Sequence, residues 1–346
     1  MTTSTLVIRA DASVAIGTGH VMRCLALAQA WQDAGGHSVF ALAETTPAVN
    51  ERLRREGHDT VRLAIAPGTL EDSDQTACLA AERLANWVVV DGYGFGSDFQ
   101  RSLIGSGLKV LFIDDNAGCD YYAANLVLNQ NVYALAADYR DRDPATKLLL
   151  GLRYALLRRE FTQLRSWKRQ IPTIARNLLV TMGGSDPTNL TSRVLQALQQ
   201  IDIEHINVRI AIGGSNPHRA SLEKSASQIS GCVELLNDVQ NMAELIASAD
   251  VGVAAAGTVS WEICALGLPS LLVPVADNQM RAAEELGRLG AALIISPNFG
   301  LTEIESTLRD LMQSASSREK ISARGRALLD LDGPGRVVAE ILASSN

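Results

Sequence analysis

Short, continuous runs of apolar residues alternate with longer segments of helical periodicity along most of this chain. Continuous apolar runs are typical of strands that are buried on both faces. Strands that alternate with helices form βαβ units around a parallel sheet, so the sequence predicts an α/β protein. In the first half, strands are predicted at Leu6–Arg9, Val39–Leu42, Val61–Ile65, Trp87–Val90, Val110–Ile113 and Leu126–Leu128, with helices such as Val21–Asp33 and Ala77–Ala85 between them.

The alternating pattern restarts after a break near residues 155–172. Residues 156–169 are rich in arginine and have helical periodicity, and Pro172 precedes the next apolar run. Domains of ~100–200 residues are usual, so two are predicted, residues 1–155 and 172–346, joined by a linker at 156–171. Strands of the second are predicted at Leu178–Thr181, Val208–Ile212, Val233–Leu235, Val251–Ala254, Leu271–Val275 and Ala292–Ile295, and helices at Leu190–Gln200, Val259–Leu266, Gln279–Leu289, Ile304–Gln313 and Arg318–Leu329.

Two Rossmann-like domains facing each other leave a cleft between the carboxyl ends of their strands, where open α/β sheets bind ligands. The charge balance narrows the choice of ligand, because 31 basic and 38 acidic residues give a net charge of −7. Nucleic acids and anionic membranes both require clustered lysine and arginine, so we expect neither as a partner. A small anionic ligand is still compatible, because backbone amides at helix N-termini bind phosphate without basic side chains.

The cysteines and the apolar stretches indicate the compartment. The five cysteines are widely spaced and form no C-x-x-C pair, which argues against a zinc or redox dithiol site and favours reduced thiols in a cytosolic protein. Arg9 and Asp11 interrupt any apolar run near the N-terminus, so no signal peptide is expected. The longest apolar stretch, residues 263–276, contains Gly267 and Pro269 and is too short to cross a bilayer. We therefore expect a cytoplasmic protein without membrane insertion.

A glycine-rich turn follows the first predicted strand and leads into a helix. It contains Gly17, Gly19 and His20, and a turn of this kind at a helix N-terminus is suited to an anion or a sugar. It is not a dinucleotide fingerprint, since Met22 stands where the third glycine is needed, and it is not a Walker A loop, since no lysine follows Gly19. The turn is either a binding site of another kind or a tight strand-to-helix connection.

His20 is the candidate catalytic base. It falls in the first turn of the predicted helix, where the helix dipole disfavours a second positive charge and so favours the neutral imidazole that a general base needs. Asp11, at the end of the preceding strand, could orient His20 or bind a hydroxyl group, or it could be a capping or turn aspartate. The other four histidines are expected at the surface: His37, His58, His205 and His218.

Two further strands of the first half end in acidic residues. The fourth ends in Asp91-Gly92-Tyr93, and we expect the aspartate and the tyrosine to point towards the cleft. The fifth ends in Asp114 and Asp115. Adjacent residues on a strand point to opposite faces, so at most one of this pair serves the cleft. Because the spacing that a metal-binding loop needs is missing, no metal site is predicted.

The first strand of the second half runs into Gly183, Gly184 and Ser185, followed by the start of a helix. The N–H groups of such a turn can bind a phosphate. The alternative is a plain Gly-Gly turn capped by serine or aspartate.

The strand Val251–Ala254 repeats this arrangement of strand, small residues and helix. Gly257 and Thr258 can present amides to a diphosphate, and the carboxylate of Glu262 can accept two hydrogen bonds from a ribose diol. The alternative for Glu262 is a first-turn glutamate that the helix dipole favours. The next strand leads to Asp277, Asn278 and Gln279, a polar triplet that we place at the cleft.

Six motifs between Arg9 and Gln279 together resemble a known enzyme family. They are R-A-D-A-S-x-x-I-G-x-G-H-V-M-R-C, V-V-D-x-Y, L-L-G-x-x-Y-A-L-L-R-x-E-F, G-G-S-D-P, A-G-T-x-S-W-E and A-D-N-Q. In combination they resemble the UDP-2,4-diacetamido-2,4,6-trideoxy-β-L-altropyranose hydrolases of pseudaminic acid biosynthesis, the PseG family. The second half is also similar to the nucleotide-binding domain of the N-acetylglucosaminyltransferase of peptidoglycan synthesis, and spore-coat polysaccharide proteins share much of the pattern.

The resemblance implies the GT-B architecture of two Rossmann-like domains, and hydrolysis of the UDP-sugar to UDP and the free sugar through cleavage of the anomeric C–O bond. It also implies a place in the synthesis of a sialic-acid-like sugar for flagellin glycosylation. The family's catalytic base falls on His20, its tyrosine on Tyr93 and its asparagine on Asn278. No cofactor and no essential metal are implied, and the expected partner is the UDP-sugar alone, for a monomer or weak oligomer.

Two departures and two rival functions accompany this resemblance. Relatives often have a larger residue, frequently histidine, where this chain has Gly92, and a proline where it has Leu152. The first departure could alter the sugar specificity.

The rival functions are a glycosyltransferase that uses an acceptor hydroxyl in place of water, and a non-catalytic UDP-sugar-binding protein. A dehydrogenase is disfavoured by the absent dinucleotide fingerprint.

Overall fold

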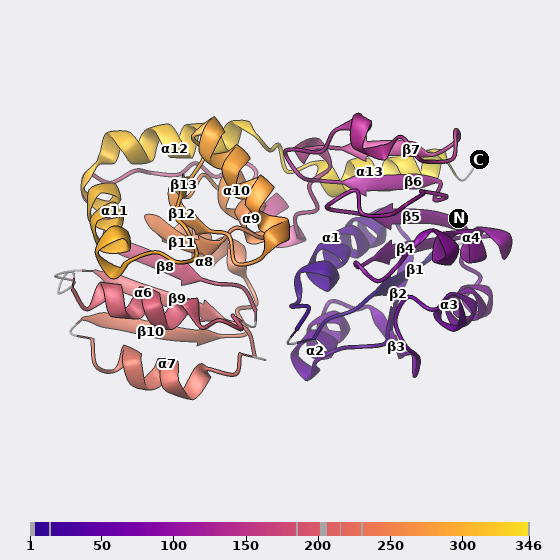
Figure 1. Cartoon of the computed structure of the whole chain (residues 1–346), viewed down its shortest axis with the longest axis horizontal. Coiled ribbons are helices and arrows are strands. Elements are labelled where there is room, and N and C mark those ends of the chain that lie inside the picture. The colour runs from indigo at the N-terminus through magenta and orange to yellow at the C-terminus, as the bar shows by residue number, and fades with distance from the viewer. Residues whose placement is uncertain are drawn as a thin grey trace. The chain divides into compact units, whose positions relative to one another are not determined.

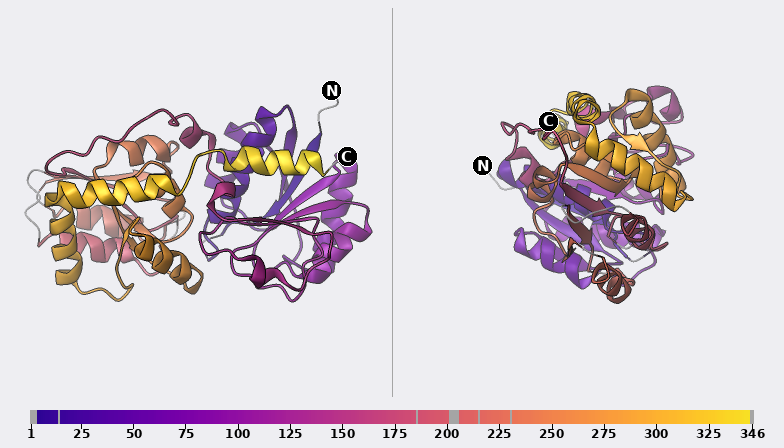
Figure 2. Two further views of the ribbon diagram at one scale, coloured as in Figure 1. Left: turned by 90° about the horizontal axis from the view of Figure 1, so that it is seen from above. Right: turned by 90° about the vertical axis from the view of Figure 1, so that its left-hand side faces the viewer.

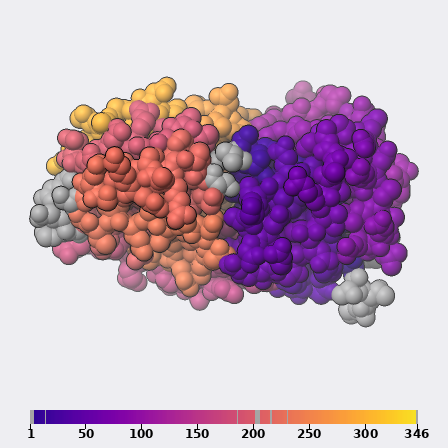
Figure 3. All heavy atoms as spheres, turned by 90° about the horizontal axis from the view of Figure 1, so that it is seen from below, coloured from indigo at the N-terminus to yellow at the C-terminus, as the bar shows by residue number. Residues whose placement is uncertain are grey.

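A computed structural model describes residues 4–13, 15–184, 186–200, 206–214, 216–229 and 231–344. The chain divides into two compact units, Met1–Arg159 with Asp332–Asn346, and Glu160–Leu331 (Figure 1). On the face seen in Figure 3, the first unit is formed by segments coloured indigo to purple and the second by segments coloured pink to yellow. None of the described helices is long and apolar enough to cross a membrane.

The first unit is built on a parallel sheet of seven strands in the order β3-β2-β1-β4-β5-β6-β7. The strands are β1 (Thr5–Ala10), β2 (His37–Leu42), β3 (Asp59–Arg62), β4 (Trp87–Asp91), β5 (Lys109–Ile113), β6 (Leu126–Asn129) and β7 (Lys147–Leu150). The helices are α1 (Gly19–Asp33), α2 (Pro47–Arg55), α3 (Leu70–Glu82), α4 (Ser97–Gly105) and α13 (Gly333–Ala343), with the short 3-10 helices η1 (Ala136–Tyr139) and η2 (Leu152–Tyr154).

Both faces of this sheet are buried at its central strands, which explains their continuous apolar runs. Alternate residues of β1 enter different cores: Leu6 and Ile8 pack with residues of α1, α2 and α13, whereas Val7 packs with residues of α3 and α4. A strand that is covered on both faces favours apolar side chains at successive positions. The first unit therefore has three layers, with helices on each side of the sheet.

The second unit repeats this plan on a parallel sheet of six strands in the order β10-β9-β8-β11-β12-β13. The strands are β8 (Asn177–Thr181), β9 (Asn207–Ile212), β10 (Cys232–Asn237), β11 (Val251–Ala255), β12 (Ser270–Val273) and β13 (Leu293–Ile294). The helices are α6 (Leu190–Leu198), α7 (Arg219–Ala226), α8 (Met242–Ser248), α9 (Val259–Ala265), α10 (Asp277–Leu289), α11 (Leu301–Gln313) and α12 (Ala315–Ala327).

Each sheet reverses its strand order at one point. In the first sheet this point lies between β1 and β4, and in the second between β8 and β11. The loops that leave neighbouring strands at such a point run to opposite sides, which opens a crevice at the carboxyl ends where doubly wound sheets bind ligands. All the loops singled out in the sequence leave strands at or beside these two points.

The predicted division of the chain differs from the observed one at the C-terminal helix. The sequence assigned residues 172–346 to the second domain, but α13 belongs to the first unit. Figure 2 shows this helix in yellow, next to elements of the first unit. Its side chains Val337, Val338 and Ile341 are buried in the same core as α1, so tertiary packing places α13 with residues far from it in the sequence.

The predicted linker at 156–171 is not the continuous helix that its periodicity suggests. Only α5 (Arg159–Thr162) is helical there. Arginine side chains hold the segment through hydrogen bonds to helix ends instead. The guanidinium of Arg169 donates to the carbonyl oxygens of Ile246 at 2.8 Å and of Leu266 at 2.9 Å. These carbonyls lie at the ends of helices α8 and α9, where the backbone leaves acceptors without partners inside the helix.

One histidine prediction was wrong. His58 was expected at the surface, but it is only 4% exposed. Its Nδ1 lies 2.8 Å from the hydroxyl of Ser38, and its ring packs against Phe40. The turn before β3 directs His58 onto the neighbouring strand, which the local sequence does not reveal. His205 lies outside the described residues.

Candidate active site

The strand order of the first sheet brings His20 to Asp91. β1 pairs with β4, so that Ala10 lies beside Asp91, and α1 begins shortly after β1 ends. The Nδ1 atom of His20 lies 2.6 Å from Oδ1 of Asp91. His20 is 7% exposed and Asp91 is fully buried. The Nδ1 side of the imidazole is therefore held at the switch point of the sheet, the place between β1 and β4 where the strand order reverses.

Arg23 holds the same aspartate from the next turn of α1. It lies three residues after His20 and so on the same face of the helix. Its Nε donates to Oδ2 of Asp91 at 2.6 Å and its Nη2 to Oδ1 at 2.6 Å, while Nη1 reaches Oδ1 of Asp115 at 2.7 Å. A bidentate contact of this kind fixes the carboxylate in orientation as well as in position.

The protonation state of Asp91 decides which nitrogen of His20 carries the proton. Burial favours the neutral acid, but the charge and hydrogen bonds of Arg23, with those of His20, outweigh it and hold the pKa of Asp91 well below its usual value. Asp91 is thus a carboxylate, which only accepts hydrogen bonds. His20 must donate from Nδ1, so in the neutral ring the lone pair lies on Nε2, the nitrogen that a general base uses here.

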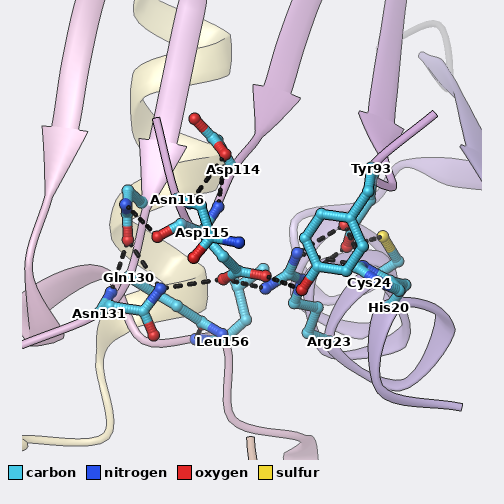
Figure 4. A network of polar contacts seen from close by, with 12 residues as sticks. His20, Arg23, Cys24, Tyr93, Asp114, Asp115, Asn116, Gln130, Asn131 and Leu156 are labelled. Atoms are coloured by element: carbon cyan, nitrogen blue, oxygen red, sulfur yellow. Dashed lines mark hydrogen bonds and ion pairs between the residues drawn. The ribbon is translucent and has the colours of Figure 1, made fainter. Parts of the chain in front are cut away.

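Tyr93 and Asp115 complete a closed set of contacts that we call the polar ring, made of His20, Arg23, Tyr93, Asp91 and Asp115. Figure 4 labels all of these residues except Asp91. The hydroxyl of Tyr93 donates to Oδ2 of Asp115 at 3.1 Å. Its aromatic ring packs edge-on against His20, with 4.9 Å between the ring centroids. Tyr93 is 60% exposed, so it links the buried carboxylates to the surface.

Asp115 is held in the polar ring from the other side by Asn131. The Nδ2 atom of Asn131 donates to Oδ1 of Asp115 at 2.9 Å. Burial favours the neutral acid, but the charge of Arg23 and the hydrogen bonds from Arg23 and Asn131 lower the pKa of Asp115. With both carboxylates ionised and Arg23 positive, the polar ring carries one net negative charge while His20 is neutral. A proton taken up by His20 brings this sum to zero.

Asp11, one of the predicted catalytic residues, has a different role in the structure. Its Oδ1 accepts the N–H groups of Ala43 at 2.8 Å and Glu44 at 2.9 Å, and it forms an ion pair with Arg9 at 2.7 Å. These contacts match the alternative of a turn aspartate, here holding the loop after β2. The carboxylate that contacts His20 is Asp91.

The two adjacent aspartates after β5 point in different directions, as the alternation of a strand predicts. Asp115 joins the polar ring, whereas Asp114 accepts the backbone N–H of Asn116 at 3.1 Å and the hydroxyl of Tyr122. Of the glycines before α1, Gly17 has φ of +81° and donates its N–H to the carbonyl of Ser13 at 2.8 Å, and Gly19 is the first residue of α1.

Gly92 sets the path of the backbone into Tyr93. Its φ is +151°, and a Cβ atom there would lie 2.9 Å from the ring of Phe95. That ring is buried, packs against Phe99 and lies under the guanidinium of Arg9. A side chain at position 92 therefore requires the backbone, and with it Tyr93, to move.

We accordingly expect Gly92→Ala to displace Tyr93 from His20 and Asp115. The turnover rate should fall on the order of 10-fold, because small displacements of positioning groups are costly, while nucleotide affinity stays unchanged. Steady-state kinetics and calorimetry measure the two quantities. Gly96→Ala is the matched control, because a Cβ atom at Gly96 meets nothing within 4 Å. Equal rates for both variants would contradict this role of Gly92.

In the second unit, the predicted nucleotide-binding turns leave the two strands that flank the switch point. Gly183 and Gly184 follow β8, and Gly257 and Thr258 follow β11, its neighbour in the sheet. Gly183 has φ of +85°, a conformation that favours glycine. Ser185, the third residue predicted in the first turn, lies outside the described residues.

The remaining predicted residues belong to the helices that follow β11 and β12. Glu262 lies in the first turn of α9 and is half-buried. Asn278 and Gln279 lie in the first turn of α10. The side chain of Gln279 accepts the N–H of Val275 at 3.0 Å, and it lies beside Gly257, where an added Cβ atom would be 3.4 Å from its Nε2. The loops after β11 and β12 therefore meet.

Sequence reasoning missed the partners of His20. Asp91 was expected to point towards the cleft and Asp115 was one of two strand-end aspartates, but neither was linked to His20. Arg23 and Asn131 were not singled out. One signal was present, since Arg23 follows His20 at helical spacing. The pairing of β1 with β4 is what brings Asp91 to the histidine, and it comes from the topology. Among the described residues, no group of three histidine, cysteine, aspartate or glutamate side chains could hold a metal ion.

Comparison with solved structures identifies the fold. The structure of Acinetobacter baumannii MurG superposes with a TM-score of 0.64 and 18% identity over 99% of both chains. The spinosyn forosaminyltransferase SpnP gives a TM-score of 0.65 and 13% identity, also over 99% of both chains. The fold is that of the GT-B glycosyltransferases. The predicted fold class, two α/β domains with parallel sheets of the GT-B type, is confirmed.

Sequence comparison agrees with this fold. Residues 177–329 match the model of the glycosyltransferase family 28 C-terminal domain. The UDP-2,4-diacetamido-2,4,6-trideoxy-β-L-altropyranose hydrolase of Campylobacter jejuni is 27% identical over 82% of this chain and 96% of its own length. The spore coat polysaccharide biosynthesis protein SpsG of Bacillus subtilis is 27% identical over 67% of this chain and 68% of its own. The resemblance that the motifs indicate is thereby confirmed.

The match to a third relative covers only about half of that protein. An uncharacterized protein of Methanocaldococcus jannaschii is 24% identical over 76% of this chain, but the match covers 54% of its own length. The matched region is therefore nearly the whole of the Campylobacter hydrolase but only about half of the archaeal protein.

Proposed function

We propose that this protein hydrolyses UDP-2,4-diacetamido-2,4,6-trideoxy-β-L-altropyranose to UDP and the free sugar. The observation that carries the proposal is the contact of His20 Nδ1 with the buried Asp91 carboxylate at 2.6 Å. A histidine anchored in this way, with a carboxylate behind it, is the arrangement that many general bases use, which supports that role for His20. The similarity to the Campylobacter hydrolase supports the substrate.

UDP is proposed to bind at the switch point of the second sheet. Backbone amides of the Gly183–Gly184 turn and of the Gly257–Thr258 turn would hold the diphosphate, because the N-terminal ends of the following helices favour negative charge. The carboxylate of Glu262 would accept hydrogen bonds from the ribose hydroxyls. The match of this unit to the family 28 C-terminal domain supports the assignment.

In the proposed reaction, Nε2 of His20 removes a proton from a water molecule as the water oxygen bonds to the anomeric carbon. The bond between that carbon and the diphosphate oxygen breaks, and UDP leaves with the bonding electron pair. Asp91 stabilises the imidazolium that forms, because it accepts a hydrogen bond from Nδ1. The helix N-termini stabilise the charge that develops on the leaving diphosphate.

Tyr93 and Asn278 are proposed to orient the sugar and the attacking water. The Tyr93 hydroxyl donates to Asp115, and its ring lies against His20, so it couples the position of a bound sugar to that of the base. Asn278, in the first turn of α10, offers an amide donor and acceptor at the edge of the nucleotide site. Asp11 is not given a catalytic role, because its carboxylate holds the loop after β2.

Hydrolysis in ¹⁸O-labelled water, followed by mass spectrometry, tests the reaction. Attack at the anomeric carbon predicts one labelled oxygen in the free sugar and none in UDP, without any added acceptor. Label in UDP would indicate attack at phosphorus and contradict the proposed chemistry. An intact nucleotide sugar after incubation with folded protein would favour a binding protein without catalytic activity.

A glycosyltransferase is the second candidate function. The GT-B fold and the family 28 domain favour it, because the related structures include named glycosyltransferases. In that case an acceptor hydroxyl would replace water, with His20 in the same role. The two functions are separated by the same assay, since a transferase leaves the UDP-sugar intact until an acceptor is supplied.

A further inference from the structure

Two neighbouring turns of the second unit have nearly the same sequence. The turn after β8 reads Gly-Gly-Ser-Asp-Pro at residues 183–187, and the turn after β9 reads Gly-Gly-Ser-Asn-Pro at residues 213–217. β8 and β9 are adjacent strands of the sheet, so both turns lie at the same edge. The serine of each turn is outside the described residues.

The two turns are in direct contact through their backbones. A Cβ atom on Gly213 would lie 2.4 Å from the carbonyl oxygen of Gly184 and 2.8 Å from its Cα. Because both of these are backbone atoms, a side chain at 213 could be accommodated only by a shift of the turn itself. The ring nitrogen Nε2 of His218 also lies 3.4 Å from the carbonyl oxygen of Pro187. The second turn is thus the surface against which the first one rests.

The turns differ in the carboxylate contacts that hold them. In the first, the Asp186 carboxylate accepts the N–H groups of Leu190 and Thr191, both at 2.9 Å, and so caps α6. In the second, the N–H of Gly214 donates to Oδ1 of Asp238 at 2.6 Å. A protein carboxylate therefore already holds the second turn, and a bound anion would have to displace it. The second turn is therefore less suited than the first to binding an external diphosphate.

We propose that Gly213, held in place by Asp238, is a positioning residue for the diphosphate-binding turn at Gly183–Gly184. Its lack of a side chain lets the second turn approach the Gly184 carbonyl, and the hydrogen bond that the N–H of the neighbouring Gly214 donates to Asp238 keeps that surface fixed. This inference rests on the proposed function, because it assumes that the first turn binds the diphosphate of UDP.

The test compares UDP with uridine, which lacks the diphosphate. Gly213→Ala is expected to weaken UDP binding by roughly 10-fold, the equivalent of one charge-assisted hydrogen bond, and to leave uridine binding unchanged. Affinities are measured by calorimetry for UDP and by ligand-observed NMR for uridine, well below the melting temperature. Gly300→Ala is the control in the same unit, because a Cβ atom there meets nothing within 4 Å.

Two variants of Asp238 keep the test decisive if Gly213→Ala does not fold. Asp238 has φ of +48°, which glycine and asparagine adopt readily. Asp238→Gly removes the acceptor and should weaken UDP binding in the same selective way, whereas Asp238→Asn retains an acceptor oxygen and should bind as the wild type does.

The possible outcomes separate the two proposals. Wild-type affinity for UDP in folded Gly213→Ala would overturn the positioning role, as would an equal loss of UDP and uridine binding. If the first variant does not fold, wild-type UDP affinity in Asp238→Gly would overturn it. Failure of the wild-type protein to bind UDP would instead overturn the proposed function, and this inference with it.

Discussion

His20→Ala is expected to lower the turnover rate for the UDP-sugar by ~10²–10⁴-fold, the range that a positioned general base contributes. The effect arises because no other group of the polar ring can accept the proton of water: Asp91 and Asp115 are engaged by Arg23. The affinity for UDP should change little, since the proposed nucleotide site lies in the other unit. Rates are measured by release of UDP, and affinity by calorimetry.

Two variants control for the loss of a buried side chain. His20→Gln fills most of the same volume without an imidazole and should be as inactive as the alanine variant. His37→Ala removes a half-exposed histidine that contacts Asp59, so it should retain wild-type activity. If His20→Gln turned over substrate at the wild-type rate, His20 would have no part in the chemistry.

Asp91→Asn is expected to lower the turnover rate by ~10²–10⁴-fold, although His20 remains in place. An amide can donate to Nδ1, which would leave the proton of the ring on Nε2 and the lone pair on the wrong nitrogen. The change also removes one of the two carboxylates that hold Arg23, and breaking a buried ion pair costs roughly 3–5 kcal/mol. We therefore expect a lower melting temperature as well as a lower rate.

Asp115→Asn separates the two effects of Asp91→Asn, which are the lost orientation of the His20 ring and the lost carboxylate partner of Arg23. Asp115 is the other carboxylate partner of Arg23 but has no hydrogen bond to His20, so its asparagine variant should be destabilised with a smaller loss of rate. Nitrogen NMR of the ring gives the direct readout. The proton should lie on Nδ1 in the neutral ring of the wild type and on Nε2 in Asp91→Asn. An unchanged tautomer in Asp91→Asn would exclude the orienting role.

The central strands of both sheets could be predicted because they are buried on both faces. A run such as Trp87–Val90 has no polar position, and only a strand covered on two sides needs this. Elements with weaker local signals were missed, among them β7, α2 and α4. Helix α2 carried a recognisable start, since Thr46 accepts the N–H of Val49 and Pro47 is its first residue, but its charged sequence obscured the apolar face.

The candidate site could be predicted only in part. Composition and position singled out His20, because a histidine at a helix start after a glycine turn is unusual enough to notice. Its partner could not be found locally, because Asp91 is 71 residues away and meets it through the pairing of β1 with β4. The choice of Asp11 as a partner of His20 has the same origin: Asp11 is near His20 in sequence, but its Oδ1 accepts N–H groups of the loop after β2.

The position of α13 has a consequence for how the chain is made. The residues that finish the first unit, 332–346, follow all of the second unit along the chain. Since domains emerging from the ribosome fold from the N-terminus onwards, residues 160–331 can complete their own core while α1 still lacks its covering helix. The unit that starts to form first is thus the last to be finished. Until α13 has been made, this unit exposes an apolar surface that chaperones can bind and that can cause aggregation.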